Sequence, residues 1–194
     1  LEKEIPKDEY EYYSHSIFAD HVKSVQLGTK IIATGEPCYQ INSNDFIKID
    51  FDLMNANIES IQYELIHCDK DWQRSNLMEM EYIDGFTVNY IENNDISYGP
   101  VKQYIHYSFQ LPNENLTFLK SGNYKIKVYY EDQSENPLMT LKIFVSEQSS
   151  SVNFNLIESN NMEQRKYLQS YNLECTFEPN NIEDPYSNIF INIY

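Results

Sequence analysis

The stretch Ile61-Gln-Tyr-Glu-Leu-Ile-His-Cys-Asp-Lys-Asp-Trp72 contains the signal that decides the fold. Its first residues alternate between apolar side chains at Ile61, Tyr63 and Leu65 and polar side chains between them. This period of two is typical of a β-strand with one face on a core and the other in water. Asp69 and Asp71 favour a turn, because their carboxylates cap nearby backbone N–H groups. We therefore expect a strand that ends at Cys68, a small buried side chain.

The same alternation recurs along the chain. The inward-facing sets that we predict are Ile47/Ile49/Phe51/Leu53, Ile105/Tyr107/Phe109/Leu111, Tyr124/Ile126/Val128/Tyr130 and Met139/Leu141/Ile143/Val145, with a shorter first strand from Val22 to Leu27. Clusters of Asn, Ser, Gly and Pro separate these sets, and no long helical period lies between them. This spacing predicts an all-β fold, an antiparallel immunoglobulin-like β-sandwich.

A polar, Ser-rich segment at 146–151 suggests a domain boundary. We therefore predict an N-terminal arm over residues 1–20, a first β-sandwich domain over 21–147, and a linker with the start of a second β-sandwich domain over 148–194. The predicted strands after the boundary are Val152/Phe154/Leu156, Tyr171/Leu173/Cys175/Phe177 and Ile189/Ile191/Ile193, with a possible short helix at Met162–Ser170. Three or four strands rarely form a stable domain alone. We therefore expect the second domain to be incomplete at Tyr194.

The charge excludes two classes of partner. The chain has 30 acidic and 14 basic residues among 194, a net charge of −16. Such a surface repels phosphate backbones and anionic headgroups, so we expect no nucleic-acid binding. No apolar run approaches the ~20 residues of a membrane-spanning helix, so we also expect no direct membrane insertion. The sequence as given carries no signal peptide.

Four residues with metal-ligating side chains are close in sequence: His67, Cys68, Asp69 and Asp71. Neighbours on a strand point to opposite faces, so His67 and Cys68 cannot both reach one ion. A calcium loop starting at Asp69 would need Gly at its sixth position and Glu at its twelfth, where Arg74 and Met80 stand. We therefore predict no metal site, although an irregular calcium site remains open.

Catalytic patterns are also missing from the sequence. There is no G-x-S-x-G elbow, and only 5 glycines are available for phosphate-binding loops. We therefore predict no enzyme, no catalytic residues and no cofactor, although a pair of carboxylates for sugar chemistry remains open. The three cysteines, Cys38, Cys68 and Cys175, allow at most one disulfide and form no C-x-x-C pair. Their redox state is left open.

Five short motifs occur in a particular order: His67-Cys-Asp-Lys-Asp-Trp72, Glu81-Tyr-Ile-Asp-Gly-Phe86, Tyr104-Ile-His-Tyr107, Leu111-Pro-Asn113 and Ser121-Gly-Asn-Tyr124. In this order and spacing, Val22 to Val145 resembles the first domain of the type IX secretion system plug protein family of Bacteroidetes. Gln169 to Tyr194 resembles the start of that family's second domain, with Asp184-Pro185 near the place of its Asn-Pro turn.

The resemblance implies a function that composition does not reveal. It implies a β-sandwich that plugs the periplasmic opening of the outer-membrane translocon barrel, without chemistry. The partner would be that barrel, and the protein would be periplasmic and associated with the outer membrane. A folded domain too wide to slip through a barrel blocks leakage by its size alone.

The segment from Gln73 to Gln103 is the least regular part of the first domain and contains many apolar residues. Such a segment either packs onto its own domain, contacts a partner, or does both. Its aromatic and acidic residues, with the tryptophan before it, are the candidate partner-binding residues: Trp72, Tyr82, Asp84, Phe86, Tyr90 and Tyr98.

Two other functional classes remain open. The first is a β-sandwich adhesin or carbohydrate-binding module, in which Tyr104, His106 and the Tyr-rich strand edges would form an aromatic platform. The second is a truncated enzyme whose chemistry lies beyond Tyr194.

Overall fold

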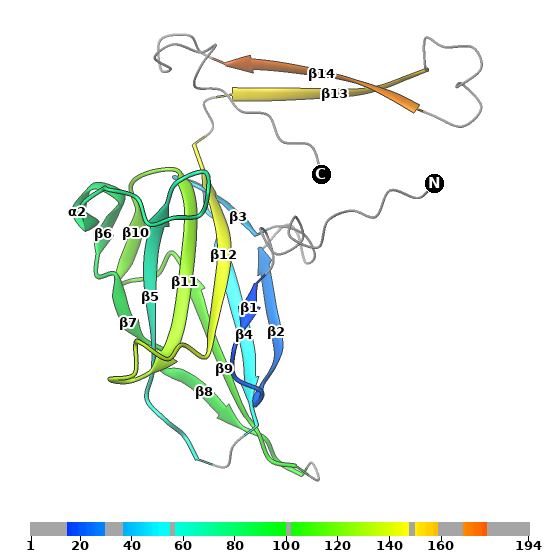
Figure 1. The fold of residues 1–194 in the computed structure, drawn as a ribbon. Coiled ribbons are helices and arrows are strands. Elements are labelled where there is room, and N and C mark those ends of the chain that lie inside the picture. Colours follow the sequence, from blue (N-terminus) through cyan, green and yellow to red (C-terminus); the bar gives the residue numbers. More distant parts are fainter. Residues whose placement is uncertain are drawn as a thin grey trace. The chain divides into compact units, whose positions relative to one another are not determined.

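The computed structural model describes residues 15–29, 37–54, 57–99, 102–147, 150–158 and 169–177. The chain divides into two compact units, residues 1–147 and 148–194, each described here by itself. The first unit contains β1 (Ser16–Ile17), β2 (Val22–Thr29), β3 (Cys38–Gln40), β4 (Ile47–Leu53), β5 (Ile61–Cys68), α2 (Glu79–Tyr82), β6 (Ile83–Gly85), β7 (Val88–Tyr90), β8 (Asn93–Ile96), β9 (Ile105–Leu111), β10 (Leu116–Phe118), β11 (Gly122–Tyr130) and β12 (Met139–Ser146). The second contains β13 (Ser150–Glu158) and β14 (Gln169–Phe177) (Figure 1). The predicted all-β class is confirmed.

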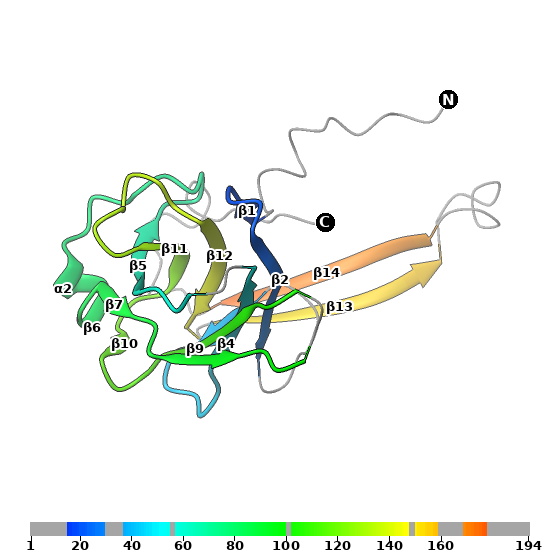
Figure 2. The ribbon, with the colours of Figure 1, turned by 90° about the horizontal axis from the view of Figure 1, so that it is seen from below.

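The first unit is a sandwich of two sheets (Figures 1 and 2). One sheet has the order β12-β11-β5-β7, with β1 and β3 both pairing along the free edge of β12. The other sheet has the order β2-β4-β9-β8. All pairs are antiparallel except β3 with β12, which is parallel. This strand order is that of an immunoglobulin-like sandwich, as the sequence predicted.

The core lies between the two sheets and is formed by the predicted inward-facing sets. Every apolar residue predicted to face inward on β4, β5 and β12 is buried. Aromatic rings stack in this layer: Tyr63 of β5 lies 4.7 Å from Phe109 of the facing sheet. Phe51 lies 5.4 Å from Tyr107, its partner on the neighbouring strand of the same sheet. Phe109 is only partly buried, because it lies near the open side of the sandwich.

Tyr124 forms the corner at the start of β11. Its hydroxyl donates to the carbonyl oxygen of Lys120 at 2.6 Å and lies 3.3 Å from the carbonyl oxygen of Tyr82. A tyrosine that bonds back to the backbone just upstream is the tyrosine corner of immunoglobulin-like domains. Its ring contacts that of Phe118 edge to face, with centroids 5.1 Å apart. The motif at 121–124 therefore stabilises the fold.

His67 joins two of the sequence motifs. Its ring contacts Tyr124 edge to face at 5.0 Å and Tyr82 at 5.5 Å. Its Nε2 lies 3.2 Å from the carbonyl oxygen of Ser121. Gly122 lies directly beneath the ring, and a Cβ there would overlap Nε2, with φ at +149°. Glycine is required at this position because no side chain fits between the backbone and His67.

The turn after β5 is fixed by Asp69. Its Oδ1 accepts the backbone N–H groups of Asp71 and Gln73, both at 2.9 Å. Trp72 has a φ of +59°, and its ring packs edge to face on Phe144, 5.4 Å away on the outer side of the sheet. The predicted strand end and the carboxylate cap from Asp69 are confirmed. The Asp71 carboxylate, predicted to cap the same turn, bonds to Lys70 at 2.7 Å. Trp72 covers the outer side of the sheet and not the core edge.

The segment at 73–103 is more regular than the sequence indicated. It contains α2, β6, β7 and β8, and β6 pairs with β10 across 30 residues of chain. In that pair Gly85 has a φ of +116°, and a Cβ there would overlap the carbonyl oxygen of Asn115. These pairs depend on residues distant in sequence, so local periodicity does not reveal them.

Three predicted segments differ from the structure in detail. Ser16 and Ile17, within the predicted N-terminal arm, pair with Thr140 and Met139 of β12. Strand residues occupy both ends of the predicted linker, because β12 ends at Ser146 and β13 begins at Ser150. Within the predicted short helix, 169–170 belong to β14, and the rest lies outside the described residues.

The second unit is described as one hairpin of β13 and β14, paired antiparallel over nine residues. Val152 pairs with Cys175 and Phe154 with Leu173, as expected for the predicted alternating sets. Asn153, exposed, lies between them. The predicted strand at 189–193 lies outside the described residues, as does 178–188.

Replacement of Tyr124 by Phe tests the corner. The variant leaves the Lys120 carbonyl without its partner, so the free energy of unfolding should fall by about 1–2 kcal/mol. Urea unfolding measures this, and Tyr129→Phe, on the outer face of the same strand, is the control. An equal loss in both variants would show that the hydroxyl of Tyr124 has no special role.

The second prediction concerns pH. Burial lowers the pKa of His67 from its usual 6.5, with the nearby Lys120 charge acting in the same direction, although the Ser121 carbonyl opposes it. The unfolded state therefore binds this proton more readily, and the stability from neutral His67 is lost as pH falls below about 6.5. His67→Gln should flatten the pH dependence of the unfolding free energy between pH 7 and 5. An unchanged slope would contradict this.

Candidate functional site

The structure separates the six candidate partner-binding residues into two groups. Trp72 and Tyr82 are each 3% exposed, because Trp72 packs under Phe144 and the ring of Tyr82 lies against His67. Burial prevents both from touching a partner in this state, so the structure assigns them to folding. Four are exposed: Asp84, Phe86, Tyr90 and Tyr98. For these four, partner contact remains a prediction.

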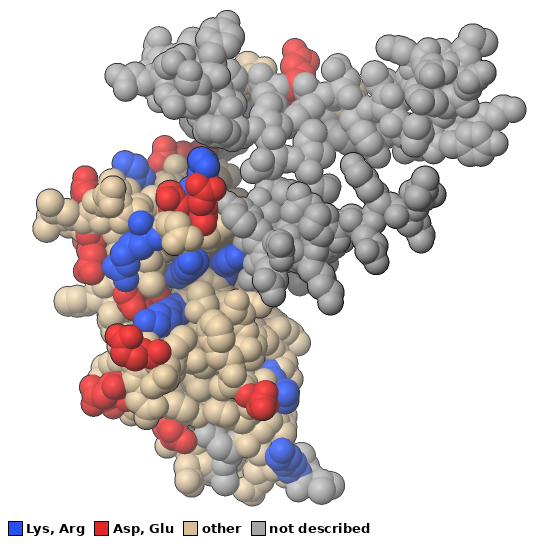
Figure 3. Space-filling view, viewed as in Figure 1, with Lys and Arg blue, Asp and Glu red and all other residues tan. Residues whose placement is uncertain are grey.

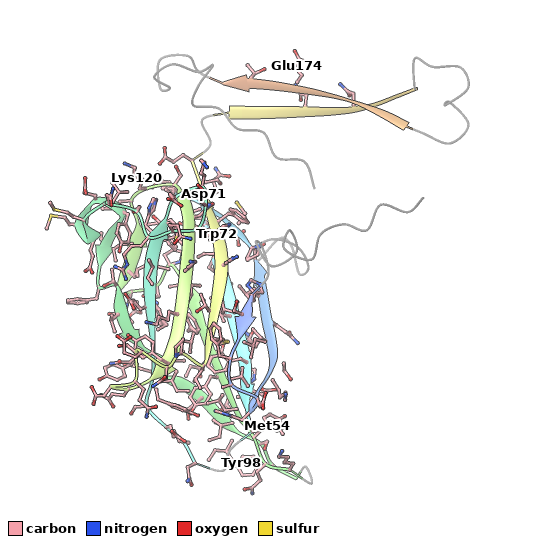
Figure 4. All side chains as sticks on the ribbon, in the orientation of Figure 1. Met54, Asp71, Trp72, Tyr98, Lys120 and Glu174 are labelled. Atoms are coloured by element: carbon pink, nitrogen blue, oxygen red, sulfur yellow. The ribbon has the colours of Figure 1, made fainter. Side chains whose placement is uncertain are left out.

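The four exposed residues do not form a single patch. Tyr98, 93% exposed, lies at the end of the sandwich opposite Trp72, as Figure 4 shows. Asp84 lies in β6, and Phe86 follows directly after it. The hydroxyl of Tyr90, on the edge strand β7, donates to Glu131, and this bond raises the pKa of Tyr90. A contact that uses all four at once would have to wrap around the domain.

One surface combines a predicted residue with others that the sequence did not suggest. We name it the α2 surface, and it consists of Met78, Met80, Phe86, Val88 and Leu119, all exposed. Two backbone bonds hold its parts together. The N–H of Leu119 donates to the carbonyl oxygen of Tyr82 at 2.9 Å, and that of Phe86 donates to Asn115 at 3.2 Å. Exposed apolar clusters of this kind mark interaction sites.

Three acidic side chains lie on or beside the α2 surface. Glu81 accepts the backbone N–H of Met78 at 2.6 Å and thereby caps the short helix. Glu79 and Asp84 are exposed beside it. An apolar centre with a polar rim is the usual composition of a protein–protein contact. The sequence signal for this site is Met78-Glu-Met-Glu81, in which methionines alternate with glutamates, and it becomes clear only once burial is known.

A shallow groove of about 370 Å³ lies on the open side of the sandwich. Its lining comprises Lys48, Tyr90, Glu92, Asn93, Ser108, Phe109, Gln110, Asn113, Glu114 and Asn115. The platform suggested for carbohydrate binding uses other residues, Tyr104 and His106, which are both half-buried. His106 binds Asp52 at 2.8 Å and Asp50 at 3.4 Å, and the N–H of Tyr104 donates to Ser97.

One pair of a serine and a histidine side chain is joined by a hydrogen bond: Ser75 Oγ lies 2.8 Å from His67 Nδ1. Because Nε2 donates to the Ser121 carbonyl, Nδ1 of the neutral ring accepts the Ser75 proton. His67 is buried among Tyr124 and Tyr82, so a substrate has no access to the pair. The pair serves packing.

The part of the chain that the structure describes contains no group of three or more His, Cys, Asp or Glu side chains placed to hold a metal ion. Cys38 and Cys68 are free thiols, and burial raises the pKa of Cys68, which makes its thiolate scarce. Within the described residues no helix is long and apolar enough to cross a membrane.

Comparisons with known proteins identify relatives of this domain. The family model for the type 9 secretion system plug protein 1st domain matches residues 22–147. A crystal structure of a hypothetical protein from Parabacteroides merdae is similar, with a TM-score of 0.80 and 26% sequence identity over 89% of this chain. The match spans 44% of that other chain, less than half of its length. No curated protein matches. The chain therefore belongs to the type 9 secretion system plug protein family, which associates it with type IX protein secretion.

Proposed function

We propose that this protein closes the periplasmic opening of the outer-membrane translocon barrel of the type IX secretion system, as a plug without enzymatic activity. Family membership supports the link to secretion. The proposal also places the protein in the periplasm at the outer membrane, since only there can it reach that opening.

The fold suits a passive obstacle. A compact unit of the size matched by the family model has a radius of gyration of ~14 Å. Its core rings and aliphatic side chains are fully buried between two sheets. Close-packed interiors have low compressibility, so such a unit keeps its width under load. Blocking therefore needs no reaction, only a folded domain and a contact that holds it in place.

The α2 surface is the observation that best supports this contact. Five exposed apolar side chains come from α2 and its cap, the segment from β6 to β7, and the end of β10, with acidic side chains beside them. Met80 is 78% exposed and Phe86 is 72% exposed, so the fold does not need them for its own core. Methionine adapts its shape to irregular partner surfaces, and phenylalanine is a common anchor at interfaces. We therefore assign the barrel contact to the α2 surface.

Replacement of Met80 and Phe86 by Ala tests this assignment. Removal of two exposed anchors should reduce co-purification with the barrel about tenfold or more, since truncation of an anchor often costs ~1–2 kcal/mol. The unfolding free energy should change by less than ~0.5 kcal/mol, because both side chains are exposed.

The matched control replaces Ile58 and Tyr98 by Ala, since both are exposed apolar side chains outside the α2 surface. This variant should keep barrel binding at the level of the unaltered protein. Loss of binding in the control with retention in the α2 variant would move the contact to the end of the sandwich that bears Tyr98. Retention in both would exclude either surface.

A carbohydrate-binding module is the second candidate, and the groove is the observation that favours it. Tyr90 and Phe109 contribute aromatic side chains to its lining, together with the amide residues Asn93, Gln110 and Asn113. Sugar sites typically combine such groups in a concave surface. A polysaccharide pull-down separates the two proposals. A carbohydrate-binding module should bind the polysaccharide, and Tyr90→Ala should abolish that binding. A plug should not bind it.

A further inference from the structure

The segment that leads into β7 and through it has an inverted pattern of burial. The polar side chains Thr87 and Asn89 are buried, whereas the apolar side chains between and around them face solvent. Phe86 is 72% exposed, Val88 42% and Tyr90 52%. We name these three residues the β7 row, and the first two also belong to the α2 surface. A strand normally turns its apolar residues to the core, so the needs of the fold do not explain this row.

The backbone of β7 has an open edge. β7 is the last strand of its sheet, as Figure 1 shows, and it pairs there with β5. The N–H of Leu65 donates to the carbonyl oxygen of Thr87 at 2.8 Å, and the N–H of Ile91 donates to β5 at 2.9 Å. Backbone groups alternate in direction along a strand, so the two N–H and two C=O groups of Val88 and Tyr90 point away from β5. Within the described ranges these four groups have no hydrogen-bond partner.

The open edges of the facing sheet are protected from pairing, but that of β7 is not. β2 has a register shift after Lys23, and Ser24 there has a φ of +52°. β8 carries the charge of Asp95. Bulges and charged side chains are usual means by which edge strands avoid pairing. The sequence Val88-Asn-Tyr90 contains no charge, and its register with β5 is regular.

The groove on the open side of the sandwich begins at the Tyr90 end of this edge. Tyr90 lines it, together with Glu92 and Glu114. Among the described residues neither of these carboxylates has an ion-pair partner, and Lys48, the cation in the lining, already bonds to Asp50 at 2.9 Å. Figure 3 shows acidic side chains, in red, on the side of the first unit where β7 lies. The groove therefore favours a basic side chain.

We propose that β7 accepts an extended segment of a partner protein as an additional strand of its sheet. The segment would alternate apolar and polar residues, so that the apolar ones lie beside the β7 row. It would also carry a basic residue at the end that reaches the groove. This mode of binding stands independently of the plug function, whereas the identification of the partner as the barrel rests on that proposed function.

Strand addition matches both the backbone and the side chains of this edge. Alternate residues of an extended chain are ~6.7 Å apart, so one segment can meet the groups of Val88 and of Tyr90 in succession. In such complexes the main-chain hydrogen bonds supply affinity and the alternate side chains supply specificity. β7 has only two outward-facing residues, so the contact with the β7 row has to contribute much of the affinity. A polysaccharide has no alternating peptide N–H and C=O groups and would use the groove alone.

The probe is the synthetic peptide Lys-Val-Thr-Val-Thr-Val-Lys, which has a lysine at both ends because a strand can add in either direction. The full chain is saturated with it, and amide hydrogen exchange is followed residue by residue. Exchange at Val88 and Tyr90 should slow about tenfold or more, because their N–H groups gain partners. Exchange at Asn89 should change by less than about twofold, since its N–H already faces β5.

Replacement of Val88 by Pro removes one outward N–H, and no bond to β5 is lost because this N–H does not face β5. The matched control, Val88→Ala, shortens the same side chain but keeps the N–H. The proline variant should bind the peptide about fivefold more weakly than the alanine variant, as the loss of one hydrogen bond implies. If the proline variant fails to fold, the exchange measurement on the unaltered chain still decides.

Any of four results would overturn strand addition. The first two are unchanged exchange at Val88 and Tyr90 with the peptide, and equal peptide affinity of the two Val88 variants. The third is equal binding of the same peptide with N-methylated valines, which keeps its side chains but cannot donate at those residues. The fourth is displacement of the peptide by the polysaccharide of the pull-down, which would assign the groove to sugar.

Co-purification with the barrel separates this mode of binding from the plug function. Weaker co-purification of the Val88→Pro variant than of Val88→Ala would identify the barrel as the partner. Peptide binding with equal co-purification of both variants would retain strand addition and assign it to another protein. Failure of the peptide tests, with loss of barrel binding in the variant of Met80 and Phe86, would retain the plug function without strand addition.

Discussion

The buried hydroxyl of Tyr124 is the constraint on which the upper end of the sandwich depends. A buried hydroxyl is costly unless it has a partner, and the Lys120 carbonyl supplies one at 2.6 Å. The Tyr82 carbonyl lies nearby, so the same corner fixes the segment that leads from α2 into β6. The ring of Tyr82, at the end of α2, packs against His67 and Tyr124 and fixes this segment on the core. The position of the α2 surface therefore depends on a contact in the core.

Much of this fold follows from local pattern. The period-two runs place Ile47 to Leu53 and Met139 to Val145 correctly, because burial on one face is a local property of a strand. The pairing of β6 with β10, and of β1 with β12, is not visible in the sequence, since each depends on a distant partner. The residues of the candidate site were harder to predict from the sequence. Trp72 and Tyr82 have side chains that suit partner contact, but both are buried. Met78 and Met80 become candidates only once their exposure is known.

The motifs that carry the family resemblance are explained mainly by packing. His67, Tyr82 and Tyr124 form one aromatic cluster, and Gly85 and Gly122 let backbone or ring atoms approach closely. Residues with such tight geometric demands make a family recognisable. They do not by themselves show what the family binds. Binding residues are better sought on surfaces where the fold places few demands, and the α2 surface is of that kind.

Two physical effects would govern a contact at the α2 surface. Burial of its exposed apolar side chains gains free energy from surface removed from water, and salt changes that gain little. The net charge of −16 repels an acidic partner over about a Debye length, so this repulsion weakens as salt rises. Charge would therefore select the partner during approach, and apolar burial would supply the lasting contact.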